Sequence, residues 1–147
     1  MTGLSTFDST VQKSMKLISR VQEEARIEDK HKAFQALRIT LQTLRDRLTV
    51  DEAAHIGAQL PNLIKGYYYE GWKPSTTPTK IRTRDEFLQQ IRDYLQNVDP
   101  TLDAEHSVRS VFKVLSHQIS EGQIGDVLHA LPEELRELWP QHEEVGQ

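Results

Sequence analysis

The sequence predicts an all-α fold, a helical bundle of about eight helices, and three observations favour it. Apolar residues recur every three or four positions through most of the chain, and few segments show the period of two that marks a half-buried strand. Threonine stands three positions before glutamate in Thr49–Glu52 and in Thr83–Glu86, the pattern of a capping box at a helix start. Prolines and glycines are expected between the periodic stretches, where they separate the helices.

The first half of the chain contains four predicted helices. The first runs from Thr10 to Ala25, and the second, from Lys30 to Leu48, carries one long apolar stripe. The third begins after Thr49 and ends near Leu60, because a residue that precedes proline is pushed out of helical geometry. Pro61 then opens a short fourth helix, where its missing N–H costs nothing.

The second half repeats this alternation of helices and breaks. A linker rich in Gly, Pro, Ser and Thr, from about 70 to 82, precedes the helix that Thr83 caps. Asp99-Pro100 is expected to end that helix and to begin another, which carries Val108 and Phe112 on its apolar face. The last residues, His142 to Gln147, are expected to form a frayed tail.

Composition excludes several classes of protein. The 147 residues are the size of one domain, 1–147, and 18 Lys+Arg against 22 Asp+Glu give a net charge of −4, without the strongly basic footprint of a nucleic-acid-binding domain. Without cysteine there is no disulfide, thiolate nucleophile or iron–sulfur cluster. No stretch is long and apolar enough for a membrane span, and the N-terminus lacks the pattern of a secretory signal. We therefore expect a cytoplasmic protein with no membrane partner.

The two halves also match each other at an offset of 71 residues. Leu60-Pro61 falls on Leu131-Pro132, and the capping box at Thr49 falls on Ser120–Gln123. The apolar stripe Ala33, Leu37, Leu41, Leu44 and Leu48 falls on Ala104, Val108, Phe112, Leu115 and Ile119. This predicts two quasi-repeats, about 7–72 and 83–140. Units this small bury too little surface to be stable alone, so the repeats are expected to share one core.

The run from Gln59 to Pro74, which contains Tyr67-Tyr68-Tyr69-Glu70-Gly71-Trp72, resembles the signature of domain-of-unknown-function family 2267. The segment from Ala130 to Trp139 is similar to the second Leu-Pro segment of that family, and the resemblance covers Phe7 to Pro140. It implies a bacterial, helical, duplicated protein with no established activity. It therefore supplies no catalytic residues that could be carried over to this sequence.

The one pattern that suggests metal chemistry is Glu52-x-x-His55, with Asp126-x-x-His129 in the second half. A carboxylate and an imidazole three residues apart share a helix face, as in di-iron bundles. However, Glu52 is already assigned to a capping box, and the two pairs do not occupy equivalent repeat positions. We expect no metal site and no cofactor, and a metal-binding helical protein is the least favoured function. No nucleophile or general base is recognisable, so the protein is expected not to be an enzyme.

The aromatic block supplies the candidate interaction surface, formed by Tyr67, Tyr68, Tyr69 and Trp72. Consecutive aromatic residues cannot all face inward, so some are expected in the core and others over the joint between the halves; this structural role is favoured. The alternative is that Tyr68 or Trp72 stays partly exposed and contacts a protein partner or a second copy, since such residues dominate binding hot spots. The expected function is a non-catalytic protein-interaction or regulatory module.

Local basic clusters support an alternative function, nucleic-acid binding. Lys80, Arg82 and Arg84 lie at a predicted helix N-terminus, which suits an anion. Basic residues also line the first helix (Lys13, Lys16, Arg20) and the second (Arg38, Arg45, Arg47), but acidic residues interleave most of them. Such charged runs are typical of solvated helix faces, so this alternative ranks second.

Overall fold

The computed structural model describes residues 2–140, and these form eight α-helices and one 3-10 helix with no strand among them. The predicted all-α fold is therefore confirmed. The tail predicted for His142 to Gln147 lies outside the described residues. The helices are α1 (Ser5–Ala25), α2 (Lys30–Arg47), α3 (Val50–Gly57), α4 (Asn62–Tyr69), η1 (Pro74–Thr76), α5 (Arg84–Gln96), α6 (Ala104–Gln118), α7 (Glu121–Ala130) and α8 (Glu133–Arg136).

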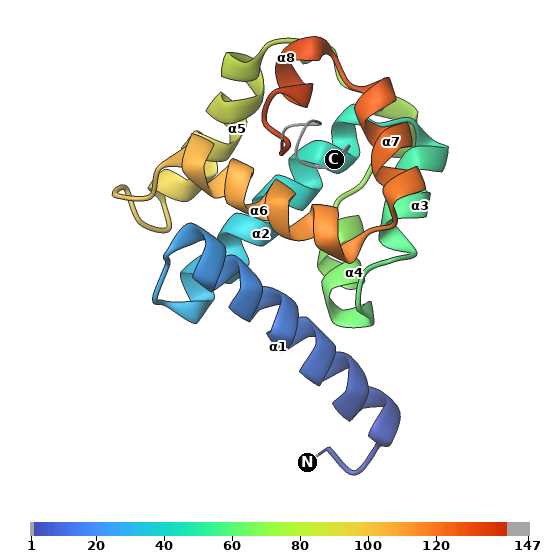
Figure 1. Cartoon of the computed structure of the whole chain (residues 1–147), viewed down its shortest axis with the longest axis vertical. Coiled ribbons are helices and arrows are strands. Elements are labelled where there is room, and N and C mark those ends of the chain that lie inside the picture. The colour runs from blue at the N-terminus through green and yellow to red at the C-terminus, as the bar shows by residue number, and fades with distance from the viewer. Residues whose placement is uncertain (1, 141–147) are drawn as a thin grey trace.

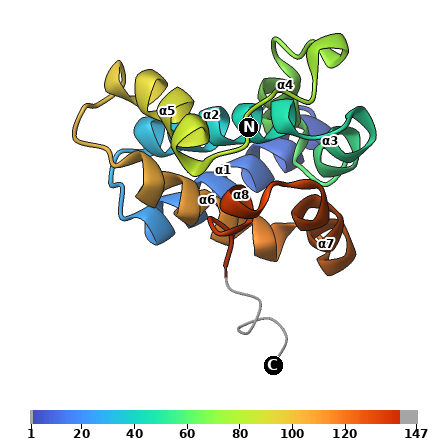
Figure 2. The ribbon, with the colours of Figure 1, turned by 90° about the horizontal axis from the view of Figure 1, so that it is seen from above.

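Helices α2 and α6 contact each other at the centre of the molecule, and α1 and α5 each contact both of them (Figures 1 and 2). The shorter helices close the ends: α3 contacts α7, α4 contacts α1 and α2, and α8 contacts α5. The N-terminal half of α1 extends beyond the rest of the bundle (Figure 1).

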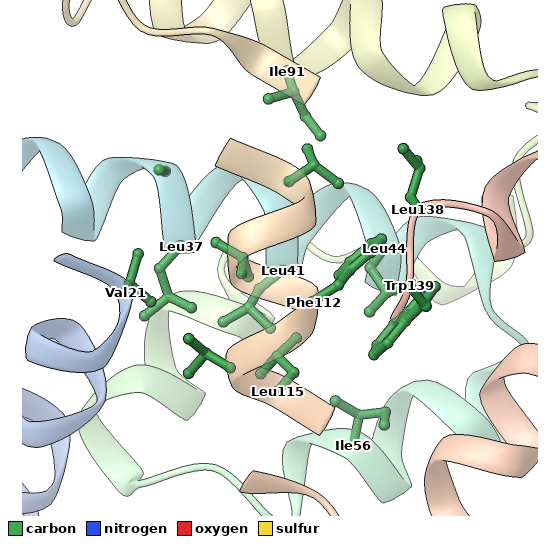
Figure 3. Close-up of a cluster of buried hydrophobic side chains, with 14 of the residues drawn as sticks. Val21, Leu37, Leu41, Leu44, Ile56, Ile91, Phe112, Leu115, Leu138 and Trp139 are labelled. Atoms are coloured by element: carbon green, nitrogen blue, oxygen red, sulfur yellow. The ribbon is translucent and has the colours of Figure 1, made fainter. Parts of the chain in front are cut away.

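One continuous cluster of buried apolar side chains draws on all eight α-helices. Leu37, Leu41 and Leu44 form its α2 side, and Figure 3 shows them in one cluster with Val21 of α1 and Phe112 of α6. The Phe112 ring stacks on that of Trp139, with centroids 4.1 Å apart and planes 8° apart. This single core therefore joins the helices of the first half of the chain to those of the second half.

The helix starts follow the capping patterns closely. At Thr49 and at Thr83 the threonine side chain accepts the backbone N–H three residues on, and the glutamate side chain accepts the threonine backbone N–H, so both predicted capping boxes form. The Ser120 side chain likewise accepts the N–H of Gln123. However, among residues 2–140 the Gln123 side chain does not accept the Ser120 N–H in return. The third box is therefore a simple N-cap.

Two predicted helix starts were wrong. Helix α1 begins at Ser5, five residues before the expected Thr10. Helix α6 begins at Ala104 with Asp103 as its N-cap, and not at Pro100. Asp99 explains the second difference, because its Oδ1 accepts the Thr101 N–H at 2.9 Å and holds this segment in a turn.

The glycines were also expected between helices, and four of them lie inside: Gly57 in α3, Gly66 in α4, and Gly122 and Gly125 in α7. Packing stabilises these helices enough to offset the weak helix propensity of glycine.

The 71-residue duplication stays a prediction. The offset relates α2 to α6 and α3 to α7, and the two helices of each pair are in contact. It also relates Tyr68 to Trp139, which are both buried.

An ion pair joins the start of α2 to the turn before α6: Lys32 Nζ lies 2.8 Å from Asp99 Oδ2. The hydrogen bond from Lys32, followed by those from the Thr101 side chain and backbone, holds the pKa of Asp99 well below its usual range. A carboxyl whose pKa is lowered by folding stabilises the protein above its unfolded pKa, near 3.9, and loses that contribution as the pH falls further.

We predict that Asp99→Asn lowers the free energy of unfolding at pH 7 and that its deficit relative to wild type shrinks below about pH 4. Urea denaturation at pH 7 and pH 3 measures both values, and Asp126→Asn, at an exposed site on α7, is the control. An equal deficit in the free energy of unfolding at both pH values would contradict the stabilising role of the ionised Asp99 carboxylate.

Candidate functional site

Tyr68 lies in the core and not on a surface. Its side chain is fully buried, and its hydroxyl donates a hydrogen bond to the Ala53 carbonyl of α3 at 2.7 Å. Burial raises the pKa of this hydroxyl above its ordinary value, so it stays a neutral donor. The alternative that Tyr68 is partly exposed for a partner is therefore wrong, and the residue joins α4 to α3.

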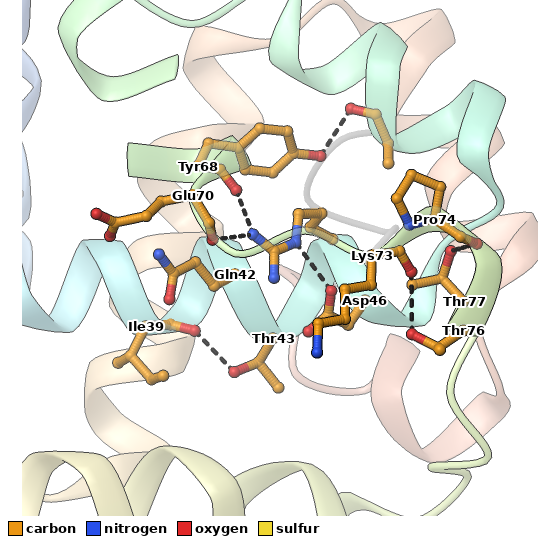
Figure 4. Close-up of polar contacts among 12 residues, drawn as sticks. Ile39, Gln42, Thr43, Asp46, Tyr68, Glu70, Lys73, Pro74, Thr76 and Thr77 are labelled. Carbon is orange, nitrogen blue, oxygen red and sulfur yellow. Dashed lines mark hydrogen bonds and ion pairs between the residues drawn. The ribbon is translucent and has the colours of Figure 1, made fainter. Parts of the chain in front are cut away.

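Arg45 binds the C-terminal end of α4 (Figure 4). Its Nη1 donates to the carbonyls of Tyr68, at 2.7 Å, and of Glu70, at 2.9 Å, while its Nε donates to Asp46 Oδ1 at 2.8 Å. Carbonyls at a helix C-terminus lack partners within the helix, and a cation there also interacts favourably with the negative end of the helix dipole. The sequence placed Arg45 on a solvated basic face, but the residue is 4% exposed because α4 and the turn after it cover it.

Tyr69 covers the end of α3, and Trp72 packs on Tyr69. The Tyr69 ring lies 5.3 Å from that of Trp72 and 5.0 Å from that of Tyr68. Its hydroxyl approaches Gly57 so closely that a Cβ there would lie 2.2 Å from it. Trp72 is half-buried and follows Gly71, whose φ of 77° turns the chain back onto the bundle. These contacts fit the structural role expected for the block.

Tyr67 has the largest exposed fraction of the four aromatic residues, 40%. Its ring meets that of Phe34 edge-on at 5.0 Å, and the Arg38 guanidinium lies 5.0 Å from its centroid. Arg38 also pairs with Glu70. Of the candidate interaction surface, Tyr67 is therefore the residue that presents most area to a partner.

The cluster of Lys80, Arg82 and Arg84, which we call the basic loop, is partly neutralised by the protein's own carboxylates. Lys80 and Arg82 are exposed, whereas Arg84 Nη1 lies 3.5 Å from Glu137 Oε2, and its backbone N–H donates to Glu134 Oε1. Glu86 Oε1 accepts the N–H groups of Arg82 and Thr83 at 3.1 Å each, which lowers the pKa of Glu86. The start of α5 thus already holds two carboxylates, which leaves little of it for an external anion.

The residues weighed for metal binding are spread out. Glu52 is engaged by the N–H and hydroxyl of Thr49 in the capping box, and the side chains of His55, Asp126 and His129 are exposed. Across residues 2–140, no three His, Asp or Glu side chains gather closely enough to hold a metal ion.

An exposed apolar stripe on α1 was missed by the sequence analysis. Leu4 precedes the helix and is 55% exposed, Phe7 is 56% exposed, and Val11 and Met15 continue the stripe at helical spacing. We call these four residues the overhang face. The predicted helix begins at Thr10, so Leu4 and Phe7 fall outside it, although their helical spacing to Val11 is a signal present in the sequence. Because the helix projects past the bundle, this part of its apolar face stays uncovered (Figure 1).

Helix α4 lies beside the overhang and exposes two apolar side chains of its own. The Leu63 N–H donates to the Thr10 hydroxyl of α1 at 3.2 Å, and Leu63 and Tyr67 are 46% and 40% exposed. Five of the six large apolar side chains that residues 2–140 expose lie on α4 or on α1 and the residue before it.

A second missed feature is a groove of about 880 Å³ between α1, the α3–α4 connection and the end of α6. Lys13, Lys16 and Arg20 line it together with hydroxyl and amide side chains. The sequence showed these three cations on one face of a helix, but not the elements that form the opposite wall. We call this feature the cationic groove.

The contact between Gly57 and Tyr69 generates a prediction about the aromatic block. Gly57→Ala should lower the free energy of unfolding by about 1–3 kcal/mol, because the new Cβ overlaps the Tyr69 ring. Gly66→Ala on α4 is the matched control: a Cβ there meets nothing within 4 Å, and replacing a helical glycine should stabilise the protein by up to about 1 kcal/mol. Urea denaturation measures both changes.

Tyr69→Ala in the Gly57→Ala background should remove the cost of the new Cβ, since the two residues are in contact. If both glycine variants are stabilised equally, the close packing of Tyr69 on α3 is refuted.

Comparison with known proteins identifies the family and no activity. No helix among residues 2–140 is long and apolar enough to cross a membrane. No curated protein matches the chain. The model of one family, described as uncharacterized conserved protein, matches residues 14–138, which include α2 to α8 and most of α1. The chain therefore belongs to the DUF2267 family, as its Leu-Pro segments and aromatic block suggested.

Proposed function

We propose that the protein is a non-catalytic protein-interaction module, and that the overhang face is the surface with which it binds a second copy of itself. The observation that carries the proposal is the apolar stripe of Leu4, Phe7, Val11 and Met15 on a helix that projects from the bundle. Exposed apolar patches are costly in water and mark interaction sites in soluble proteins.

A second copy is the partner that suits this surface best. The steps of three and four residues from Leu4 to Met15 are those of helices that pack side by side. In a two-fold dimer each chain uses the same patch, so an apolar stripe on one helix complements its counterpart in the partner. Stable interfaces bury about 800 Å² per partner, more than four partly exposed side chains supply, so we expect a weak dimer.

The absence of catalysis is part of the proposal. Of the titratable side chains considered for chemistry, Glu52 is engaged in a capping box, and His55 on α3 and Asp126 and His129 on α7 are exposed. A cytoplasmic location and a bacterial source are likewise proposals, which rest on composition and on the family resemblance.

Nucleic-acid binding by the basic loop is the weaker candidate. Lys80 and Arg82 are exposed, but Arg84 is paired with Glu137, so the loop offers two uncompensated side chains. Each phosphate contact adds a modest increment to nucleic-acid affinity, so two cationic side chains would support only weak binding.

The proposal predicts concentration-dependent dimerisation. The mass measured by light scattering should rise from 17.0 kDa toward twice that value between about 10 and 500 µM chain, the range of a weak dimer. Phe7→Asp should remain monomeric, because it places a charge at the centre of the apolar contact. Phe7 is more than half exposed, so circular dichroism should show an unchanged helical content.

Ser9→Asp is the matched control. It adds the same charge to the same helix, but Ser9 is exposed on the face that lines the cationic groove, nearly half a turn from the overhang face. It should dimerise like wild type. A wild-type protein that stays monomeric up to about 500 µM, or two variants that behave alike, would refute the proposal.

A further inference from the structure

The cationic groove lies on the side of α1 opposite the overhang face. Lys13, Lys16 and Arg20 recur at steps of three and four residues, so they share one face, about half a turn from the stripe of Phe7 and Val11 at 3.6 residues per turn. The other wall is formed by the α3–α4 connection, by Asn62 at the start of α4 and by Gln118 at the end of α6.

The groove walls are fixed by hydrogen bonds between distant segments. The Gln118 side chain accepts from Arg20 Nη1 at 3.5 Å and donates to the Gln59 carbonyl at 3.4 Å, which joins α6 to α1 and to the α3–α4 connection. Thr10 accepts the Leu63 N–H of α4 on the groove side. The cations of α1 therefore face a groove wall that these hydrogen bonds hold in position.

The charge balance inside the groove differs from that of the whole chain. No carboxylate is among the described residues that line it, although the protein carries a net charge of −4. Lys13, Lys16 and Arg20 are all exposed, and none of them takes part in the ion pairs found within residues 2–140. Glu23 and Glu24 line the neighbouring hollow beyond Arg20, so the positive charge is strongest around Lys13 and Lys16.

The spacing of the cations indicates what kind of anion fits. At a rise of 1.5 Å per residue, Lys16 lies about 4.5 Å along the axis from Lys13, and Arg20 lies about 6 Å beyond Lys16. A row of cations suits an extended ligand with several negative groups better than a single small ion. Hydroxyl and amide side chains beside the row, Thr10 and Asn62 among them, can donate to phosphate oxygens.

We propose that the cationic groove binds a ligand with successive phosphate groups, either a nucleic-acid backbone or a free polyphosphate chain. The aromatic side chains on which bases stack in single-strand-binding proteins are missing from the described lining of the groove, so it recognises phosphates and not bases. This site is separate from the basic loop at Lys80, and it does not require the dimer proposed above.

The test uses the full chain at 50 mM NaCl with two probes, a fluorescein-labelled twelve-nucleotide oligo-dT and inorganic tripolyphosphate. Fluorescence anisotropy and calorimetry should give dissociation constants on the order of 10–100 µM, as for sequence-independent binding. For the oligonucleotide, three phosphate contacts predict that the logarithm of the binding constant falls with the logarithm of the salt concentration with a slope of about 2.

The decisive variant replaces the three groove cations, Lys13→Gln, Lys16→Gln and Arg20→Gln. The matched control removes three exposed cations elsewhere, Lys30→Gln, Lys80→Gln and Arg82→Gln, and so keeps the net charge of the two variants equal. The groove variant should bind at least about tenfold more weakly, because each phosphate contact contributes to affinity, while the control should stay within about twofold of wild type. Circular dichroism checks that both variants keep their helices.

Each result decides the proposal. Loss of binding in the groove variant alone supports it, and the probe that binds then identifies the source: oligo-dT for a nucleic-acid backbone, tripolyphosphate for a free chain, or both for a site that reads only the shared phosphates. Failure of both probes to bind wild type, or equal losses in the two variants, overturns it. The Phe7→Asp protein should bind like wild type, so failure of the dimer leaves this test intact.

Discussion

The hydrogen bonds of Arg45 to the end of α4 are the interaction on which the first half of the structure depends. A guanidinium presents several N–H donors in a planar fork, so a single side chain can satisfy the Tyr68 and Glu70 carbonyls while it pairs with Asp46. If this cation were absent, both carbonyls would lose this donor, and the buried Tyr68 carbonyl would lose it where water is excluded. Arg45 thereby fixes the C-terminal end of α4, which carries the three tyrosines of the aromatic block, against α2.

The aromatic block carries this constraint to the neighbouring helices. Once α4 is held, Tyr68 reaches the Ala53 carbonyl, and Tyr69 fits over Gly57 because α3 has no side chain there. Trp72 then covers Tyr69, and Gly71 provides the positive φ at which the chain turns toward the second half. Three consecutive tyrosines thus have three different surroundings: Tyr67 faces solvent beside Arg38, Tyr68 is in the core, and Tyr69 covers α3.

Helix α1 combines the features that we associate with function. Its C-terminal half belongs to the core through Leu17 and Val21, whereas its N-terminal half projects from the bundle with an apolar stripe. The groove cations, Lys13, Lys16 and Arg20, run along the opposite side of the helix and continue into its C-terminal half. A helix can serve two partners in this way because side chains half a turn apart point in opposite directions. A polyanion in the groove and a second chain on the overhang face would not compete for space.

The sequence by itself determined the helical fold, most helix bounds and the two Thr–Glu capping boxes, because these depend on residues within a few positions of one another. Tertiary structure decided which side chains are covered. Arg45 is buried because α4 and the turn after it lie over it, and Phe7 is exposed because no other element among residues 2–140 covers its side of α1. The groove has the same origin, since its walls are segments more than thirty residues apart that meet only in the folded chain. Periodicity reports which face of a helix is apolar, but the partner that covers the face is a long-range contact that no local pattern contains.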